Sequence, residues 1–468
     1  MRPGYRFINS APAYNIPLQF PKKHRPMATT FLFDWFAPCP RGLEAPLAAE
    51  LAEIGAKHIE GSQFRTGKEV PGGVHFRGSW AAGMAANLHS RIASRVLLKL
   101  AQGPYRSEHD IYELAYQQQW EKWFSPNETI RVDITAIKSP LRSLEFATLR
   151  VKDAVCDRLR ELTGNRPSVD TAQPDVRVFA FLTLNECTLY LDTSGDPLFK
   201  RGWRLDKGAA PLRENLAAGI LRLTGWTPGT PLYDPMCGSG TFLAEAAQVA
   251  LNIAPGVDRS FGFEKLKQYD VNAWQKLKGA AVDAKRAAQS SRADIQIYGS
   301  DISGDMLDKA YSNLERAGLP ELSLKQLDAR HMTPPSDTPG ILVANPPYGE
   351  RIEVRGRGPR GELREPKNRG HDEDEDAFIR AQPDPADQEF FISFGNAMKQ
   401  QFPGWRAYVL TSDRKLPGML RLRESTKTPL FNGALECRLF RFDMIAGSVR
   451  NRPAATEPAA DQTPDAQE

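Results

Sequence analysis

The second half of the chain alternates short apolar runs with stretches in which apolar residues recur at helical spacing. Runs with the length of a buried strand occupy residues 232–234, 295–299, 322–327, 341–344 and 407–411. Amphipathic patterns predict helices at 241–251, 303–318 and 390–402, and a closing hairpin is expected at 429–442. Strands that alternate with helices predict an α/β domain built on an open parallel sheet.

The first half follows a different pattern and has no glycine-rich ligand loop. Strands are expected at 31–36, 73–76 and 131–137, with a hairpin made of 176–184 and 188–192. Helices are expected at 43–54 and 147–162, and Ser79 is expected to cap a helix that continues to Leu100. Residues 30–204 therefore form a separate α+β region.

The length of the chain, 468 residues, indicates about two to four domains. Its hydrophobic fraction of 41% is enough for real cores, and no apolar run approaches the ~20 residues that span a bilayer. The net charge is only +4, so a nucleic-acid surface has to be local. The cysteines lack metal-ligand spacing, which predicts no metal site and a reducing, cytoplasmic location: Cys39, Cys156, Cys187, Cys237 and Cys437.

The compositions of three segments predict that these segments are not part of the packed domains. Residues 1–29 are proline-rich and basic without a signal-peptide core, and Met27 is a candidate native start because an apolar run follows it. Residues 447–468 predict a disordered tail. In the insert 351–387, the residues up to Gly370 include seven Lys or Arg and three Glu. The residues after Gly370 include seven acids and one Arg. We expect a flexible loop there whose basic half contacts phosphates.

The stretch with the most chemical information is residues 232–242, which read L-Y-D-P-M-C-G-S-G-T-F. Gly238 and Gly240 can take positive φ, so a ligand can approach the backbone at the start of the next helix. The loop has neither the lysine of a phosphate cradle nor the third glycine of a dinucleotide fingerprint. Asp234 can accept a bond from an ammonium group, which favours a cationic nucleotide-like ligand. A plain tight turn is the alternative.

Two further acids follow predicted strands, at the edge where an open parallel sheet places ligand contacts. Asp301 stands where it can hold both ribose hydroxyls of an adenosine, and Asp328 where it can accept from the adenine amino group. The competing interpretations are a helix-start charge for Asp301 and a solvated loop for Asp328. Glu214 and Asn215, ahead of this sheet, are candidates for a helix cap.

The fourth strand delivers Asn345, Pro346, Pro347 and Tyr348, which read N-P-P-Y. The prolines stiffen the loop and remove two backbone donors, so carbonyl oxygens remain free as acceptors. The Asn345 side-chain oxygen and the Pro346 carbonyl can then hold the N–H groups of an exocyclic amine, while Tyr348 stacks on the base. This arrangement is typical of amine methylation, although four residues can also form a plain turn.

Several runs carry resemblances to known families. D-P-M-C-G-S-G-T resembles the first motif of class I methyltransferases, which implies S-adenosyl-L-methionine as cofactor. Resemblance to this family also implies the rim of the cofactor pocket as the other possible place of Glu214 and Asn215. L-R-V-K-D-A at 149–154, R-P-S-V-D at 166–170 and K-R-G-W-R at 200–204 resemble the THUMP domain of RNA-modifying enzymes. That resemblance implies binding of structured RNA. From the residues alone, candidate phosphate contacts are Lys152, Arg166, Lys200, Arg201 and Arg204, and a solvated surface charge is the alternative for each of them.

From about residue 30 to 445 the chain resembles bacterial 23S rRNA guanine-N2 methyltransferases, without the second methyltransferase domain that some members carry. The resemblance implies a Rossmann-like class I methyltransferase domain at 205–446, preceded by a ferredoxin-like subdomain at 30–75 and a THUMP domain at 76–204. It implies that 23S rRNA or a pre-ribosomal particle is the partner. The implied cofactor residues are Asp234, Pro235, Cys237, Gly238, Gly240, Asp301 and Asp328, and the catalytic ones Asn345, Pro346, Pro347 and Tyr348.

Three other functions are open to the same sequence. A tRNA guanine-N2 methyltransferase would share both halves, and an adenine-N6 DNA methyltransferase would share N-P-P-Y. A catalytically silent RNA-binding module is disfavoured by the two intact loops. Because every proposed cofactor contact lies within 205–446, that segment is expected to bind the cofactor by itself.

Overall fold

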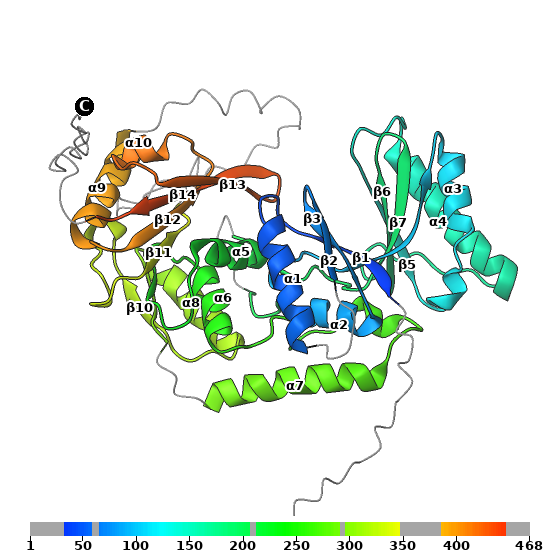
Figure 1. Cartoon of the computed structure of the whole chain (residues 1–468), viewed down its shortest axis with the longest axis horizontal. Helices are drawn as coiled ribbons and strands as arrows, with labels where there is room; N and C mark the ends of the chain where they lie inside the picture. Colours follow the sequence, from blue (N-terminus) through cyan, green and yellow to red (C-terminus); the bar gives the residue numbers. More distant parts are fainter. Residues whose placement is uncertain (1–31, 59–64, 206–211, 291–294, 347–384, 446–468) are drawn as a thin grey trace, which may run out of the picture. The chain divides into compact units, whose positions relative to one another are not determined.

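The computed structural model describes residues 32–58, 65–205, 212–290, 295–346 and 385–445. The expected N-terminal extension, most of the charged insert, the tail, Pro347 and Tyr348 lie outside these ranges. Within them, two seven-stranded mixed sheets, each flanked by helices, confirm the expected α+β and α/β halves (Figure 1).

The N-terminal sheet joins the ferredoxin-like and THUMP-like segments in one strand order, β2-β3-β1-β4-β7-β6-β5. All its neighbours are antiparallel except β5 and β6. The proposed boundary at 75/76 falls within β3. The strands are β1 Phe33–Pro38, β2 Arg65–Val70, β3 Gly73–Gly78, β4 Leu97–Pro104, β5 Ile130–Ala136, β6 Val176–Leu182 and β7 Glu186–Asp192, and the helices are α1 Glu44–His58, α2 Trp80–His89, α3 Glu108–Tyr116 and α4 Leu144–Thr163.

One prediction in this half is wrong, because the helix capped by Ser79 does not reach Leu100. Helix α2 ends at His89, and Leu97 and Leu98 belong to β4. The carboxylate of Glu50 accepts hydrogen bonds from Ser90 Oγ and from the N–H groups of Arg91 and Ile92, at 2.6 to 3.2 Å. These N–H groups would otherwise continue the helix, so a side chain 40 residues away terminates it.

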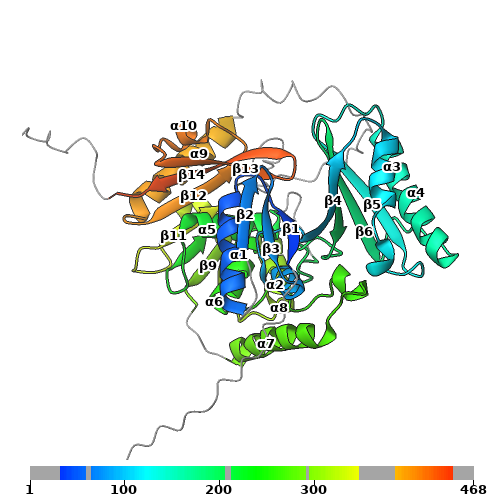
Figure 2. The same ribbon diagram turned by 45° about the vertical axis from the view of Figure 1, so that its right-hand side comes forward.

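The C-terminal sheet has the strand order β10-β9-β8-β11-β12-β14-β13. The first five strands are parallel to one another, β14 is antiparallel to β12, and β13 is antiparallel to β14. Its strands are β8 Leu232–Asp234, β9 Ile297–Asp301, β10 Ser323–Gln326, β11 Ile341–Ala344, β12 Arg406–Thr411, β13 Thr426–Asn432 and β14 Leu435–Asp443. Its helices are α5 Glu214–Thr224, α6 Thr241–Ala250, α7 Val271–Ser290, α8 Gly304–Arg316, α9 Pro385–Gln401 and α10 Leu416–Leu420. Figure 2 shows α6 and α8 beside this sheet.

A buried charge cluster joins the two halves behind the glycine-rich loop. Glu245 of α6 has no exposed side-chain surface, and it pairs with Arg201 at 3.1 Å and with Arg91 at 3.4 Å. Arg201 also donates to the carbonyl oxygens of Leu198 and Arg91, at 2.7 and 2.6 Å. The helix that begins at the loop is therefore held by charges from the first half.

A second ion pair extends this contact between the two halves, which we call the seam, toward the glycine-rich loop. Arg204 donates to Glu214 at 3.3 Å and also bonds the hydroxyl of Thr241, the first residue of α6. Burial raises the pKa of Glu214 and lowers that of Arg204. Arg201 and Arg204 are 1% and 5% exposed, so the expectation that they contact RNA phosphates is wrong for these two residues.

The same seam bears on the expectation that residues 205–446 bind the cofactor alone. A fragment that begins at residue 205 lacks Arg91 and Arg201 and leaves the Glu245 carboxylate buried without either partner. An uncompensated buried charge is costly. We therefore expect the full chain, rather than this fragment, to be the unit that binds the cofactor.

Two arginines that link the halves allow a matched test of this seam. Arg201→Met should lower the free energy of unfolding by up to about 3–5 kcal/mol, because it leaves Arg91, at 3.4 Å, as the one remaining ion-pair partner of Glu245 among the described residues. Arg222→Met breaks the pair with Glu53, whose side chains are 34% and 48% exposed, and should cost at most about 1 kcal/mol. Urea unfolding measures both. Equal losses in the two variants would contradict a stabilising role for the buried cluster.

Candidate active site

Three neighbouring parallel strands end at one place in the C-terminal sheet. β8 pairs with β9 on one side and with β11 on the other, and the chain order of the strands reverses at β8. Asp234 ends β8, Asp301 ends β9, and Asn345 follows β11. Ligands of open α/β sheets bind at such a reversal, outside the carboxyl ends of the strands. The structure thus brings together residues that are 111 positions apart in sequence.

The glycine-rich turn between β8 and α6 has the backbone that its sequence predicts. Gly238 and Gly240 have φ of +53° and +81°. A side chain on Gly240 would lie 3.2 Å from the Ala310 Cβ of α8, whereas at Gly238 the nearest atom would be the Met306 Cε at 3.6 Å. Gly240 is needed for both conformation and packing, while Gly238 leaves its side of the turn open to a ligand.

Asp301 fastens this turn to the neighbouring strand. One of its carboxylate oxygens accepts the Gly238 N–H at 2.9 Å, and the other accepts the Ser303 N–H at 2.9 Å. Ser303 is the N-cap residue of α8, but its own side chain makes no cap bond. Each oxygen of Asp301 keeps a lone pair, so a half-buried carboxylate remains available at the strand end.

Asp234 is a buried acid at the centre of the site. Its side chain is enclosed, and one oxygen accepts the Met236 N–H at 3.1 Å. Burial raises the pKa of Asp234 well above its usual range, and the nearby charge of Asp301 adds to the shift. A cationic group bound here would restore the ionised form, which is the chemistry expected of an ammonium partner.

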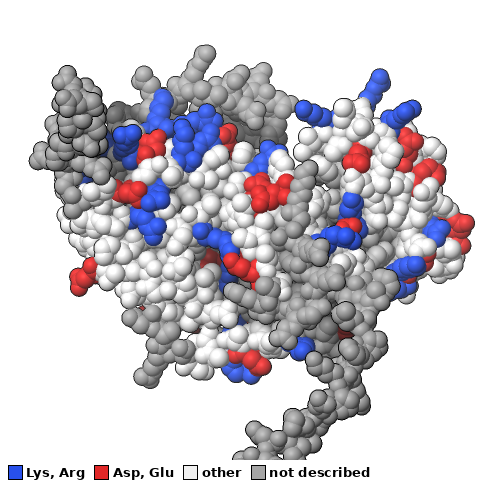
Figure 3. Space-filling view, in the orientation of Figure 1, with Lys and Arg blue, Asp and Glu red and all other residues white. Residues whose placement is uncertain are grey.

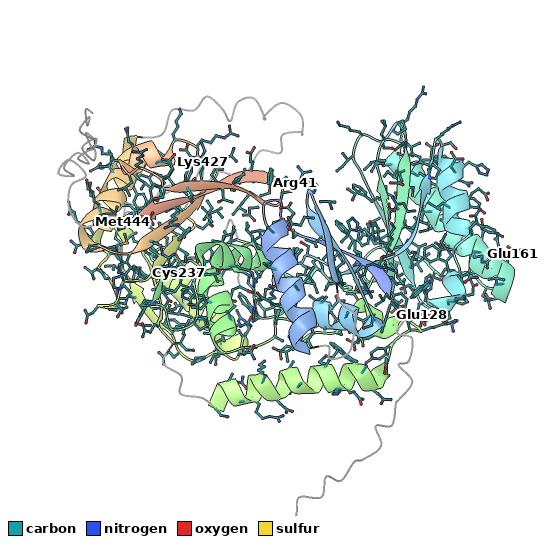
Figure 4. The ribbon with its side chains drawn as sticks, in the orientation of Figure 1. Arg41, Glu128, Glu161, Cys237, Lys427 and Met444 are labelled. Carbon is teal, nitrogen blue, oxygen red and sulfur yellow. The ribbon has the colours of Figure 1, made fainter. Side chains whose placement is uncertain are left out.

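The other proposed cofactor residues differ in how accessible they are. Pro235 and Cys237 are buried, and the Cys237 N–H donates to the Ser300 carbonyl oxygen at 2.9 Å (Cys237 is labelled in Figure 4). Burial raises the pKa of the Cys237 thiol well above its usual value, so the thiol stays protonated. The Asp328 carboxylate holds the Arg330 guanidinium at 2.6 Å, which lowers the pKa of Asp328. Contact of Asp328 with an adenine amine stays a prediction.

Asn345 presents the polar atom expected of an amine-binding loop. Its side-chain oxygen is buried and has no hydrogen-bond partner among the described residues. A buried acceptor without a partner is costly, and such atoms are retained where a ligand supplies the donor. Pro346, directly after it, is buried.

Two polar residues that support the site were missed in the sequence. Asn313 of α8 is fully buried and donates to the Ser239 carbonyl oxygen at 3.0 Å, so it holds the middle of the glycine-rich turn. Ser300 lies under the same turn, 2.7 Å from the Tyr233 hydroxyl. The signal for Asn313 was an amide on the apolar face of a helix, next to Leu314 and at helical spacing from Ala310.

A separate cavity of about 970 Å³ lies at the seam. Its lining includes the rim candidate Glu214 but none of the residues proposed for cofactor binding or catalysis. Both charge signs line it, including Asp175, Lys200, Arg213 and Lys265. Within the described ranges, no group of three or more His, Cys, Asp or Glu side chains is placed to hold a metal ion. No helix in those ranges is both long and apolar enough to cross a bilayer.

Comparison with known families matches three consecutive segments of the chain. The RlmL ferredoxin-like domain matches residues 34–97, the THUMP domain 105–192, and the RMKL-like methyltransferase domain 201–360. A putative RNA methyltransferase of Synechocystis, slr0064, is 34% identical over 412 residues, which cover 88% of this chain and 96% of that protein. The chain belongs to this THUMP-domain methyltransferase family.

Further relatives define the cofactor and the extent of the match. Ribosomal RNA large subunit methyltransferase K/L of Aeromonas hydrophila is 36% identical over 447 residues, which cover 92% of this chain and 57% of that protein. The chain therefore spans little more than half the length of that relative. The crystal structure of SMU.472, a putative methyltransferase complexed with SAH, is 26% identical, with a TM-score of 0.72 over 89% of this chain and 99% of that one. The match to the methyltransferase domain places the chain in a methyltransferase family whose cofactor is S-adenosylmethionine.

The positive-φ glycines, the enclosed carboxylate of Asp234 and the free lone pairs of Asp301 fit this cofactor. Asp234→Asn keeps the acceptor for Met236 N–H but removes the charge. Because the folded-state pKa of Asp234 is raised, the stability that this carboxyl contributes is present at low pH and lost as the pH rises through that pKa. The melting temperature of Asp234→Asn should therefore exceed that of the parent by a margin that grows from pH 5 to pH 8.

The same variant should bind S-adenosylmethionine about 10- to 100-fold more weakly at pH 8, because a charge-assisted bond to the ammonium group is lost. Differential scanning fluorimetry and calorimetry measure the two effects. A variant that binds the cofactor as tightly as the parent would remove Asp234 from the site. A variant that melts lower at pH 8 would contradict the burial argument.

Proposed function

We propose that this protein transfers a methyl group from S-adenosylmethionine to the exocyclic N2 of a guanine in 23S rRNA. The observation that supports it most is the Asn345 side-chain oxygen, which has no hydrogen-bond partner among the described residues and lies next to the strand that leads into the cofactor loop. The large-subunit rRNA is suggested by the name of the relatives that are 36% identical. Because the chain spans only part of those relatives, the substrate is a proposal for this chain.

The residues proposed for catalysis act by holding an amine. The Asn345 Oδ1 accepts one N–H of the guanine amino group and the Pro346 carbonyl accepts the other, which fixes the direction of the nitrogen lone pair. Pro347 stiffens the loop, and Tyr348 stacks on a base that has left its helix. When bound, S-adenosylmethionine supplies an electrophilic methyl group. No strong base is needed, since the nitrogen can lose its proton after it has attacked.

The proposed cofactor residues lie at or after the ends of β8, β9 and β10, on the side of β11 away from β12. Asp234 is proposed to face the ammonium group, Asp301 the ribose hydroxyls, and Asp328 the adenine edge. Gly238 and Gly240 allow close approach, and Pro235 and Cys237 shape the turn through the backbone. We also propose the division into a ferredoxin-like subdomain at 30–75, a THUMP domain at 76–204 and a methyltransferase domain at 205–446.

Methyl transfer from labelled cofactor to purified 23S rRNA, tRNA and DNA tests the substrate class. Labelling of 23S rRNA above the other two supports the proposal, and labelling of tRNA alone would favour a tRNA guanine-N2 methyltransferase. Labelling of DNA alone would favour an adenine-N6 enzyme. No transfer to any of them, with cofactor bound, would indicate a silent RNA-binding module.

Asn345→Ala provides the test at residue level. It should leave the melting temperature and cofactor affinity close to the parent values and lower single-turnover methyl transfer by at least ~100-fold, because near-attack geometry is lost. Asn345→Asp is the matched control, since it keeps an acceptor oxygen and should retain part of the rate. An Asn345→Ala rate equal to the parent rate would show that this loop is not the catalytic one.

A further inference from the structure

The surface of the methyltransferase domain carries a concentration of cations that the site described above does not use. Residues 412–428, which connect β12 through α10 to β13, contain five Lys or Arg and two acids. Figure 3 shows Lys and Arg side chains gathered over the region that Figure 1 labels α10, β13 and β14, and Figure 4 labels Lys427 there. The first residues of this segment follow the carboxyl end of β12, the strand beside β11 and Asn345. Lys427 lies on β13, three strands from β11, and is level with Ala344 in the register of the sheet.

Four of these cations are exposed and form no ion pair with any residue that the structure describes. They are Lys415, Arg421, Arg423 and Lys427, and we refer to them as the basic strip. Their neighbours differ, because Arg414 and Arg438 both pair with Glu436, and Arg441 pairs with Asp443. The basic strip is therefore a local excess of positive charge on a chain whose net charge is only +4.

The segment that carries the strip is fixed to the core under the catalytic edge. Leu416, Met419 and Leu420 of α10 are buried in one apolar cluster with Ala344, the residue before Asn345. A side chain on Gly395 of α9 would lie 2.1 Å from the Leu420 carbonyl oxygen, so the two helices touch through their backbones. The cations thus have a fixed place relative to the strand ends.

Arg421 has a backbone conformation that glycine would adopt at lower cost. It ends α10 with φ of +52° and ψ of +34°, in the left-handed region, and its N–H donates to the Gly418 carbonyl oxygen at 3.2 Å. Helices commonly end in this conformation with glycine. A long cation kept at a strained position, with an exposed side chain and no acidic partner among the described residues, indicates a function outside the folded chain.

We infer that the basic strip binds the phosphate backbone of the RNA substrate beside the nucleotide that enters the Asn345 loop. This inference rests on the proposed function and extends it by naming a second RNA-contacting surface, on the methyltransferase domain itself. Exposed cations that have no acidic partner among the described residues, on the same domain as a site for an extruded base, can neutralise phosphates that flank that base. Such contacts position the strand without reading its sequence.

Arg421→Gly separates binding from folding, because it removes the cation and relieves the backbone strain. The melting temperature should stay equal to or rise above that of the parent, while the Kd for a 23S rRNA transcript should rise about 3- to 10-fold at 0.1 M salt. The slope of log affinity against log salt should fall by about one. Replacing Lys415, Arg423 and Lys427 with Gln as well should lower the slope by about three to four in total.

Arg414→Gln is the control, because Arg414 lies in the same segment but pairs with Glu436, so its removal should change Kd less than twofold. Cofactor affinity should be unaffected in every variant. The inference is overturned if the fourfold variant binds the transcript with the Kd and salt slope of the parent. It is also overturned if binding is lost only to assembled ribosomal particles, which would indicate an acidic protein as the partner.

The outcomes for the strip and for the proposed function are separable. A parent protein that methylates 23S rRNA alongside a fourfold variant with unchanged binding refutes the strip alone. A parent that labels no rRNA refutes the proposed function, and the same salt titration with poly(U) then decides whether the strip binds RNA phosphates. An unchanged slope with poly(U) would refute the strip as well.

Discussion

The arrangement of this molecule depends on one carboxylate that water cannot reach. Glu245 lies on the first turns of the helix that begins at the cofactor loop, and its charge is compensated by Arg91 and Arg201 from the N-terminal half and the segment that follows it. A buried charge without partners costs several kcal/mol, so we expect the loop helix to lose stability when the N-terminal half is removed. The seam therefore joins the N-terminal half and the methyltransferase half of this chain into one folded unit.

Contacts on both sides fix the glycine-rich turn of the proposed cofactor site. The Arg204 side chain connects the same seam to Thr241, directly after Gly240, while Asp301 holds Gly238 from the other side. The turn is thus fixed from both ends before any ligand binds, which reduces the ordering cost of cofactor binding. The Asn345 side-chain oxygen, which has no hydrogen-bond partner among the described residues, follows β11 at the edge of the sheet where the strands end.

Much of the fold followed from local patterns in the sequence, and the failures have physical causes. The strands around Asp234, Asp301 and Asn345 were predictable because short buried parallel strands have continuous apolar runs with polar residues at their ends. The end of α2 was not, because Glu50, distant in sequence, terminates that helix. Arg201 and Arg204 carried the same signal as surface cations, and only the position of Glu245 and Glu214 shows that they are buried. The strained backbone of Arg421 likewise has no signature in a single sequence.

The central claim is that the Asn345 loop presents an exocyclic guanine amine of 23S rRNA to the methyl donor. Nucleoside mass spectrometry of 23S rRNA methylated by the purified protein tests it most directly, with Asn345→Ala as the blank. We expect a single new product, N2-methylguanosine, that is absent with the variant. A product methylated at the N6 of adenine or at a ring carbon, or N2-methylguanosine formed equally by Asn345→Ala, would contradict it.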